Sequence, residues 1–466
     1  MSVKSQMATY LQGRRQVEPN DGDNSRREYG NNVTLPATGI TDDASERTPL
    51  ISHPVTIVED FGKSTVKQTV FNSVNALMGI AILSLPFAFK YAGWLFGVSI
   101  FLFCLIQTNY TAKLIKKCLD TDSGCLTYAD LAYLAFGKKG RLIMGGLFLL
   151  DLFNATVALM ILTGDSLQTL FPNVDLVRLK LIAFFIITPT TWMPIHFLSH
   201  VSIFGIAATI SLAVVILIDG FTKFDPPGSL LNPMETHFLP PNWMVLPLAF
   251  GLINAGFTGH AVFPSLYRDM AKPESYNSMV NYSYLIASTI YITVAASGYL
   301  MFGSGTMEEI TINIMSTRGF NVLLNSIVIW MIVINPLSKY PLMLTPINIS
   351  IEVVFFKMVS IGSKFSRNVY TIISRTFVSF LILYTSIIFP EFDRAMSLLG
   401  AFFSFLISAI FPILCYLKLF GHQLSNKTLA LNIMFLVIST IMAIIGTIWT
   451  FFPREWLDDK VESHMI

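Results

Sequence analysis

Two apolar stretches contain amides, glycines and prolines where a continuous helix would avoid them. The first, residues 74–94, carries Asn75, Gly79 and Pro86, and we expect Pro86 to free the carbonyl of Ile82. The second, residues 243–270, is interrupted as heavily, by Gly251, Asn254, Gly256, Gly259, His260 and Pro264. Such breaks leave backbone groups without helical partners. Free amides suit a carboxylate and free carbonyls suit an ammonium group, so the pair could bind a zwitterion.

The elements that hold these stretches are predicted to be membrane-spanning helices. Hydrophobic residues make up 53% of the 466-residue chain and charged residues only 13%. Soluble domains carry roughly 25% charged residues. The mean hydropathy is +0.60. The composition therefore predicts an all-α integral membrane protein in a lipid bilayer, and the net charge of +2 gives no reason to expect a nucleic acid partner.

Eleven segments approach the length of about 20 apolar residues that crosses a bilayer. They are residues 69–90, 94–115, 142–170, 178–194, 198–219, 243–267, 277–302, 319–347, 368–389, 394–417 and 428–452. The fourth is short and contains Pro189 and Pro194. Lys and Arg concentrate before the first span and after the even-numbered spans, which predicts a cytosolic N-terminus and a lumenal C-terminus.

The chain is expected to divide into three regions. Residues 1–62 are polar, lack the apolar core of a signal peptide, and are predicted to form a disordered cytosolic tail. Residues 63–453 form the membrane domain and residues 454–466 a lumenal tail. Within the first region, Glu46, Leu50 and Ile51 fit the acidic dileucine pattern that sorting adaptor complexes read. The pattern is short and supports delivery to a vacuole or lysosome only alongside other features.

The two interrupted stretches lie in spans one and six, which are related by a shift of five. In lipid, irregular backbone persists only beside protein or a water-filled cavity. One such helix could be a proline kink with small residues for packing. Two in corresponding positions are typical of a transporter with inverted repeats, which predicts a LeuT-type bundle of five plus five spans with span eleven peripheral. The expected substrate-binding residues are Asn75, Met78, Gly79, Ile80, Ala81, Asn254, Phe257, Thr258 and Gly259.

Both stretches resemble the amino acid/auxin permease family, part of the amino acid–polyamine–organocation superfamily. The first-helix pattern reads here as Asn75, Gly79, Ile80, Ala81, Ile82, Leu83, Leu85, Pro86, Phe87, Ala88, Phe89, Gly93 and Trp94, with Ala81 in place of the family's second glycine. The sixth-helix pattern is Gly259, His260, Phe263, Pro264 and Met270. Residues 335–347, NPLSKYPLMLTPI, look most like the vacuolar members of fungi and plants. The resemblance implies proton-coupled movement of neutral amino acids across the vacuolar membrane.

Ionisable side chains within spans are candidates for proton coupling, since they are costly in a bilayer. Lys339 lies in span eight, which faces span one in LeuT-type folds, and could replace a bound cation; otherwise it extends to the interface. Asp151 in span three could carry a proton or pair with a neighbouring helix. His260 could titrate, or be a hydrogen-bonded residue where span six restarts. Charged residues near span ends are expected at the membrane interface: Asp165, Asp219 and Arg375.

Other functions are weighed against a secondary active transporter. A channel or uniporter would show polar stripes along several spans. An intramembrane enzyme would need paired acids, a His-rich metal set or an activated nucleophile, and neither HExxH nor GxSxG occurs. The sequence therefore predicts a transporter that is not an enzyme and needs no cofactor or metal. An amino acid sensor on the same scaffold stays open; it would bind substrate with little flux.

Overall fold

The computed structural model describes residues 64–192, 202–358 and 364–452. Secondary structure in these ranges is helical, apart from one isolated parallel bridge between Ser64 and Met270. Both predicted tails, and with them Glu46, Leu50 and Ile51, lie outside the described residues.

Every predicted span contains helix. The α-helices are α2 Val66–Leu77, α3 Leu85–Leu119, α4 Tyr128–Leu170, α5 Leu176–Ile187, α7 Ser202–Thr222, α8 Leu246–Ala255, α9 Phe263–Arg268, α10 Tyr276–Phe302, α11 Ile310–Ser316, α12 Val322–Met358, α13 Lys364–Ile388, α14 Phe392–Leu398, α15 Phe411–Phe420 and α16 Asn426–Thr450. Short 3₁₀ segments join several of them: η1 Ile80–Ser84, η2 Thr188–Trp192, η3 His260–Val262, η4 Pro273–Ser275, η5 Gly303–Gly305 and η7 Gly421–Gln423. A π-helix, η6 Leu399–Ile410, joins α14 to α15.

Within the described ranges, eight helical runs are long and apolar enough to cross a membrane, judged by length and composition. One of them, Ile80–Leu119, joins the second half of predicted span one to span two. The chain turns between these parts at Gly93, whose φ is 65° and where a Cβ would lie 2.6 Å from the Leu239 carbonyl carbon. Because α5 has only 12 residues, the total of eleven crossings stays a prediction.

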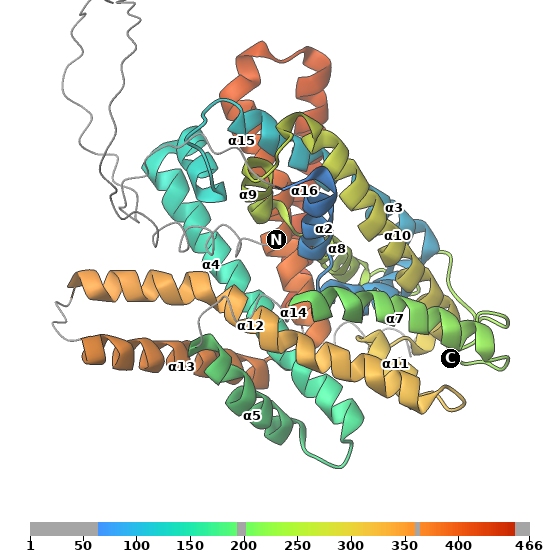
Figure 1. Ribbon diagram of the computed structural model, residues 1–466. Coiled ribbons are helices and arrows are strands. Elements are labelled where there is room, and N and C mark those ends of the chain that lie inside the picture. The colour runs from blue at the N-terminus through green and yellow to red at the C-terminus, as the bar shows by residue number, and fades with distance from the viewer. Residues whose placement is uncertain (1–63, 193–201, 359–363, 453–466) are drawn as a thin grey trace, which may run out of the picture.

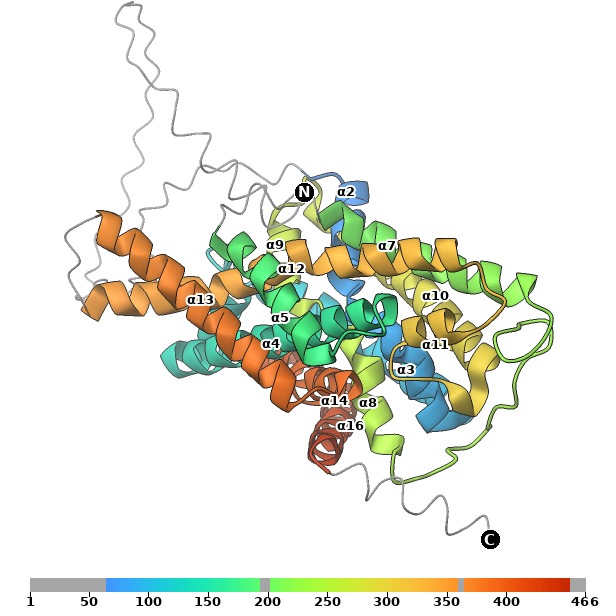
Figure 2. The same cartoon turned by 90° about the horizontal axis from the view of Figure 1, so that it is seen from below.

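The two interrupted helices pack on different neighbours. α2 lies chiefly against α10, whereas α8 lies against α3, α16 and the η6 segment (Figures 1 and 2). The long helix α12 packs chiefly on α4 and α7, and with α13 it projects to one side of the molecule. Span eight was expected to face span one, yet the broken first helix is not among the principal neighbours of α12.

The crossing of α8 and η6 brings backbone against backbone. A Cβ on Gly400 would lie 1.7 Å from the Gly251 carbonyl oxygen, and one on Gly251 would lie 2.2 Å from that of Ser397. Small residues at such crossings let helices approach closely. Gly251, expected among the residues that interrupt span six, therefore lies within α8 and serves this close packing.

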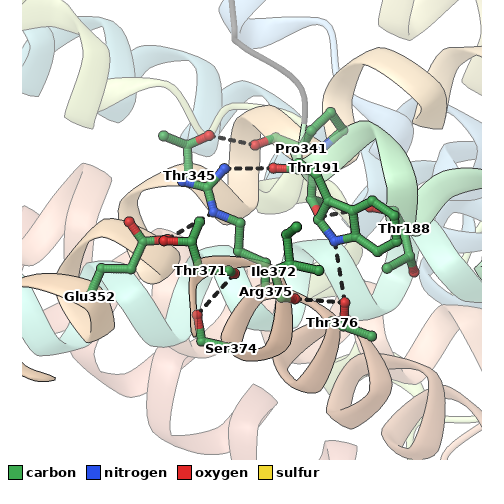
Figure 3. Close-up of polar contacts among 11 residues, drawn as sticks. Thr188, Thr191, Pro341, Thr345, Glu352, Thr371, Ile372, Ser374, Arg375 and Thr376 are labelled. Carbon is green, nitrogen blue, oxygen red and sulfur yellow. Dashed lines mark hydrogen bonds and ion pairs between the residues drawn. The ribbon is translucent and has the colours of Figure 1, made fainter. Parts of the chain in front are cut away.

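Arg375 joins α13 to α12 and η2, as Figure 3 shows. Its Nε donates to Glu352 Oε1 at 2.8 Å and its Nη1 donates to the Thr191 carbonyl at 2.7 Å. The two charged side chains are 20% and 15% exposed. Arg375, expected at the membrane interface, is therefore held in an ion pair between two helices, and its position relative to the bilayer stays a prediction. Asp219 on α7, expected at the interface as well, is buried.

Candidate functional site

The first helix breaks after Leu77. Met78 leaves the helical conformation and Gly79 is extended, with φ −97° and ψ −167°. The chain then resumes as η1. The Leu77 carbonyl is left without its helical donor and instead accepts from the Gly79 N–H at 2.8 Å and from the Tyr291 hydroxyl at 2.6 Å. The predicted interruption of span one is thus present in the structure, and it lies at Met78 and Gly79.

The sixth span breaks after Ala255. Residues 256–257 form a turn, in which Gly256 N–H donates to Ile253 O at 3.2 Å and Phe257 N–H donates to Asn254 O at 3.0 Å, and residues 258–259 are irregular. The chain then resumes as η3 and α9. Both interrupted stretches therefore contain real helix breaks, not proline kinks within continuous helices.

The two breaks are followed by the same order of elements. A glycine, Gly79 or Gly259, precedes a 3₁₀ turn that leads into an α-helix whose second residue is Pro86 or Pro264. Proline is tolerated there, since the N–H groups of a first turn have no helical partner. The prediction that Pro86 frees the Ile82 carbonyl is wrong, because that carbonyl accepts from the Leu85 N–H.

The two breaks lie next to each other. A Cβ on Gly259 would lie 3.1 Å from Leu77 Cδ2, and one on Gly256 would lie 3.2 Å from the Tyr291 ring. Tyr291, on α10, thus contacts the second break with its ring and the first with its hydroxyl. The expected substrate-binding residues of the two halves are brought together in one region.

On the second break, most side chains face away from the first. Asn254 Nδ2 donates to the Gly400 carbonyl at 3.1 Å, and Thr258 Oγ1 donates to Ser404 Oγ at 2.7 Å, so both face η6. The ring of Phe257 packs edge-on against Phe101. Met78, Ala81, Asn254, Phe257 and Gly259 are buried, whereas Asn75, Gly79, Ile80 and Thr258 keep partial exposure.

The π-helix η6 accepts hydrogen bonds from several helices besides α8. Thr111 on α3 donates to the Ser408 carbonyl at 2.6 Å, and Tyr128 on α4 donates to the Ile407 carbonyl. A π-helix differs from an α-helix in its backbone ladder, and such segments are frequent at functional sites. This network fixes the second break against η6 and α3.

His260 is fully buried where span six restarts. Its Nε2 lies 3.0 Å from the Thr108 carbonyl, which can only accept, so the neutral ring carries its proton on Nε2. Thr111 Oγ1 lies 2.9 Å from the same nitrogen. Nδ1 has no hydrogen-bond partner in the described part of the chain. The geometry is that of a hydrogen-bonded residue anchoring η3 to α3, one of the two roles expected for His260.

The two other coupling candidates lie apart from the breaks. Asp151 is buried in α4, and its Oδ1 has no partner among the described residues. Lys339 lies partly exposed in α12, between Pro336 and Pro341. The structure does not bring Lys339 into hydrogen-bonding contact with the carbonyls of the first break, insofar as both are described.

Hydrogen bonds connect the start of α2 to the end of α9, on one side of the two breaks. Ser64, just before α2, donates its N–H to the Asp269 carbonyl at 2.9 Å and accepts from the Ala271 N–H at 3.0 Å. Its hydroxyl also donates to Asp269 Oδ2. On the other side of α9, Arg268 Nη2 donates to the carbonyls of Leu119 and Asp122, each at 2.9 Å. The ends of both broken helices are thus held together with the end of α3.

Sequence reasoning missed the contribution of α10. Four of its five tyrosines recur seven or eight residues apart, which places them on one helix face, and these four are buried: Tyr276, Tyr284, Tyr291 and Tyr299. Tyr276 donates to the Ala112 carbonyl at 3.1 Å, and Tyr299 accepts from the His237 N–H at 2.8 Å. The regular spacing of hydroxyl-bearing rings in an apolar span is the signal that could have identified Tyr291.

Comparison with known proteins gives a consistent result. The transmembrane amino acid transporter protein family matches residues 62–452. Amino acid transporter AVT1B of Arabidopsis thaliana is 31% identical over 410 residues, which cover 85% of this chain and 72% of that protein. Amino acid transporter AVT1I of the same plant is 32% identical over 407 residues, covering 84% of this chain and 95% of that protein.

Two solved transporters share the fold. The inward-facing form of Mhp1 superimposes with a TM-score of 0.53 at 14% identity, covering 84% of this chain and 89% of that one. A substrate-bound, outward-open Na⁺-coupled sialic acid symporter superimposes with a TM-score of 0.52 at 13% identity. The match covers 82% of this chain and 89% of that one. At such identities the similarity concerns the LeuT-type fold alone.

Proposed function

Because the chain belongs to the transmembrane amino acid transporter family, we propose that it is a proton-coupled secondary active transporter of neutral amino acids in the vacuolar membrane. The observation that carries this proposal is the side-by-side placement of the two helix breaks, bridged by Tyr291. Transport would proceed by rocking of one set of helices against the other around this site, in a bundle of two inverted five-span repeats.

The substrate site is proposed to recognise the backbone of an amino acid. Gly79 and Ile80 keep partial exposure and would present main-chain groups, with Asn75 supplying an amide. Met78, Ala81, Asn254, Phe257, Thr258 and Gly259 complete the proposed set. None of these nine side chains is charged, which favours substrates with neutral side chains.

Proton coupling is proposed to involve Asp151 above all. A buried carboxylate without a partner is costly, and taking up a proton removes that cost. The unpaired Oδ1 of Asp151 supports this role. Lys339 and His260 are the other candidates. For His260, the argument rests on the Nδ1 that has no partner among the described residues.

The location and orientation follow from the tail and the loops. The Glu46–Leu50–Ile51 motif is proposed to bind a sorting adaptor complex, with the N-terminus cytosolic and the C-terminus lumenal. The concentration of Lys and Arg before span one and after even-numbered spans supports this orientation.

Uptake into acidified vesicles tests the function directly. Radiolabelled neutral amino acids are supplied to vesicles that contain the protein, with and without an uncoupler. We expect uptake that the uncoupler abolishes. Flux that persists unchanged after the pH gradient collapses would refute proton coupling and favour a uniporter. Saturable binding without flux would identify a sensor.

A substitution at the first break tests the site. An added Cβ at Gly79 meets nothing closer than the Leu77 carbonyl oxygen at 3.9 Å, so Gly79→Val should fold. We expect it to raise the KM for uptake, because the new methyl groups occupy the space proposed for substrate. Gly146→Val in α4, where a Cβ meets nothing within 4 Å, is the matched control. A normal KM in Gly79→Val would move the substrate site elsewhere.

A further inference from the structure

Three ionisable side chains meet where α11 packs on α4, at a distance from the helix breaks. Asp165 lies in the last turns of α4, Lys180 lies in α5, and Glu309 immediately precedes α11. Lys180 and Glu309 are each only 1% exposed, and Asp165 is partly buried. Asp165, which was expected at the membrane interface, belongs to this cluster. Figure 2 shows α4, α5 and α11 as neighbours.

The lysine is built into the cluster. Its Nζ donates to the Ser386 carbonyl of α13 at 2.8 Å. Its aliphatic stem lies over Gly164, where a Cβ would come within 2.7 Å of Lys180 Cγ. Gly164 therefore gives Lys180 the space to lie beside the adjacent Asp165. Asp165 and Glu309 are the charged groups that act on the Lys180 ammonium.

The two acids face each other. The carboxyl groups of Asp165 and Glu309 are close enough for each to act electrostatically on the other. Glu309 Oε2 accepts from the Thr311 hydroxyl at 3.4 Å, while Oε1 has no donor in the described ranges. Two carboxylate oxygens cannot hydrogen-bond unless a proton lies between them.

The charges of the cluster balance when one proton is added. With both acids ionised, two carboxylates and one ammonium leave one uncompensated negative charge in a buried place, which is costly. One shared proton makes the set neutral. Burial, with Asp165 and the neighbouring Glu308 adding to it, raises the pKa of Glu309 well above its usual value. The protonated form is thus favoured while α11 is docked, and docking weakens as the pH rises through that raised pKa.

The cluster is mechanically connected to the first broken helix. Lys90, in the α3 half that follows the break, donates to the Thr306 carbonyl at 2.9 Å, three residues before Glu309. Asn313 of α11 holds the same loop, accepting from Met307 N–H at 2.8 Å and donating to the Gly305 carbonyl at 2.9 Å. α11 itself packs on η1 as well as α4. A change in the docking of α11 therefore acts directly on the helix that restarts after Gly79.

We propose that Asp165 and Glu309 together bind one proton beside Lys180, and that this proton fastens α11 to α4 during transport. This inference rests on the proposed proton-coupled function. It assigns a proton-binding site distinct from Asp151, Lys339 and His260, on the lumenal side in the proposed topology.

Infrared spectroscopy of the purified full-length protein tests proton binding without reference to transport. We expect a protonated-carboxyl band that disappears as the pH is raised and that is missing in Glu309→Gln and in Asp165→Asn. Both amides keep the shape of the acids they replace. Glu235→Gln, at an exposed glutamate in the 223–245 loop, is the matched control and should keep the band. A band unchanged in both Glu309→Gln and Asp165→Asn would overturn the proposal.

Uptake assays then place the site in the transport cycle. In reconstituted vesicles, Glu309→Gln should transport with its dependence on lumenal pH lost, whereas Glu235→Gln should keep the wild-type profile. A wild-type pH profile in Glu309→Gln would overturn the link to transport. If uptake by the wild-type protein is unchanged by the uncoupler, the proposed function fails. The infrared result still decides whether the proton site exists.

Discussion

Tyr291 joins the two helix breaks, with its hydroxyl bonded to the first and its ring packed on the second. Tyr291→Phe removes the donor to the Leu77 carbonyl and keeps the ring against Gly256. Loss of one buried hydrogen bond costs about 1–2 kcal/mol. Because about 1.4 kcal/mol is tenfold in affinity, we expect the KM for substrate to rise by roughly that factor. Tyr282→Phe, at an exposed tyrosine of the same helix, should leave the KM unchanged, and equal values for the two variants would contradict the role of Tyr291.

At the level of single residues, the sequence predicted the positions of the helix breaks more accurately than their causes. Gly79 and Gly259 lie at the breaks as expected, because glycine next to polar residues in an apolar span is a local signal. Pro86 does not cause the first break, since its position relative to the helix start depends on where the backbone leaves the helix. Tyr291 was missed because its importance arises from the two helix breaks lying next to each other on α10, which no local pattern contains.

At the level of elements, the ion pair of Arg375 and Glu352 fixes α13 to α12 and η2 (Figure 3). Arg375→Gln leaves the carboxylate of Glu352 without its partner and removes the donor to Thr191. Hydrogen bonds to charged groups contribute about 1.5–3 kcal/mol, so we expect a clear loss of thermal stability in detergent. Arg178→Gln, at an exposed arginine of α5, should melt like the wild type. A melting temperature unaffected by Arg375→Gln would show that the pair contributes little.

The positions of helices along the chain were more predictable than the contacts between them. The eleven predicted segments all contain helix, because runs of apolar residues determine helix position in a membrane protein. The close approach of α8 and η6 at Gly251 and Gly400 was not predicted, since it depends on which faces of distant segments meet. The π-helical conformation of η6 was unforeseen for the same reason: its sequence is a plain apolar run.

At the level of the molecule, α12 is longer than a bilayer requires. Its 37 residues extend over roughly 55 Å, against about 30 Å of hydrocarbon. The part that projects with α13 is held by aromatic contacts, with Phe355 stacked on Tyr370 at 3.6 Å between ring centroids and Arg367 over Phe356 at 4.5 Å. We therefore expect part of α12 to lie outside the hydrocarbon core of the bilayer.

The location of the whole molecule depends on the tail motif. Replacing Leu50 and Ile51 by alanine removes the apolar pair that an adaptor complex would bind. We expect the protein to leave the vacuolar membrane and accumulate in another compartment, as seen by fluorescence microscopy of a tagged chain. Val33→Ala with Leu35→Ala, elsewhere in the tail, is the control. Vacuolar fluorescence that persists after the Leu50 and Ile51 replacements would show that the motif is not used.

The hydrogen bonds of Ser64 to Asp269 and Ala271 have a consequence for the transporter when no substrate is bound. Three hydrogen bonds close this end. At about 1 kcal/mol net each they amount to about 3 kcal/mol, or roughly a hundredfold in the ratio of closed to open molecules. In the proposed cycle, opening this end separates α2 from α9. An empty carrier would therefore open it rarely, and a proton gradient would drain slowly through unloaded molecules.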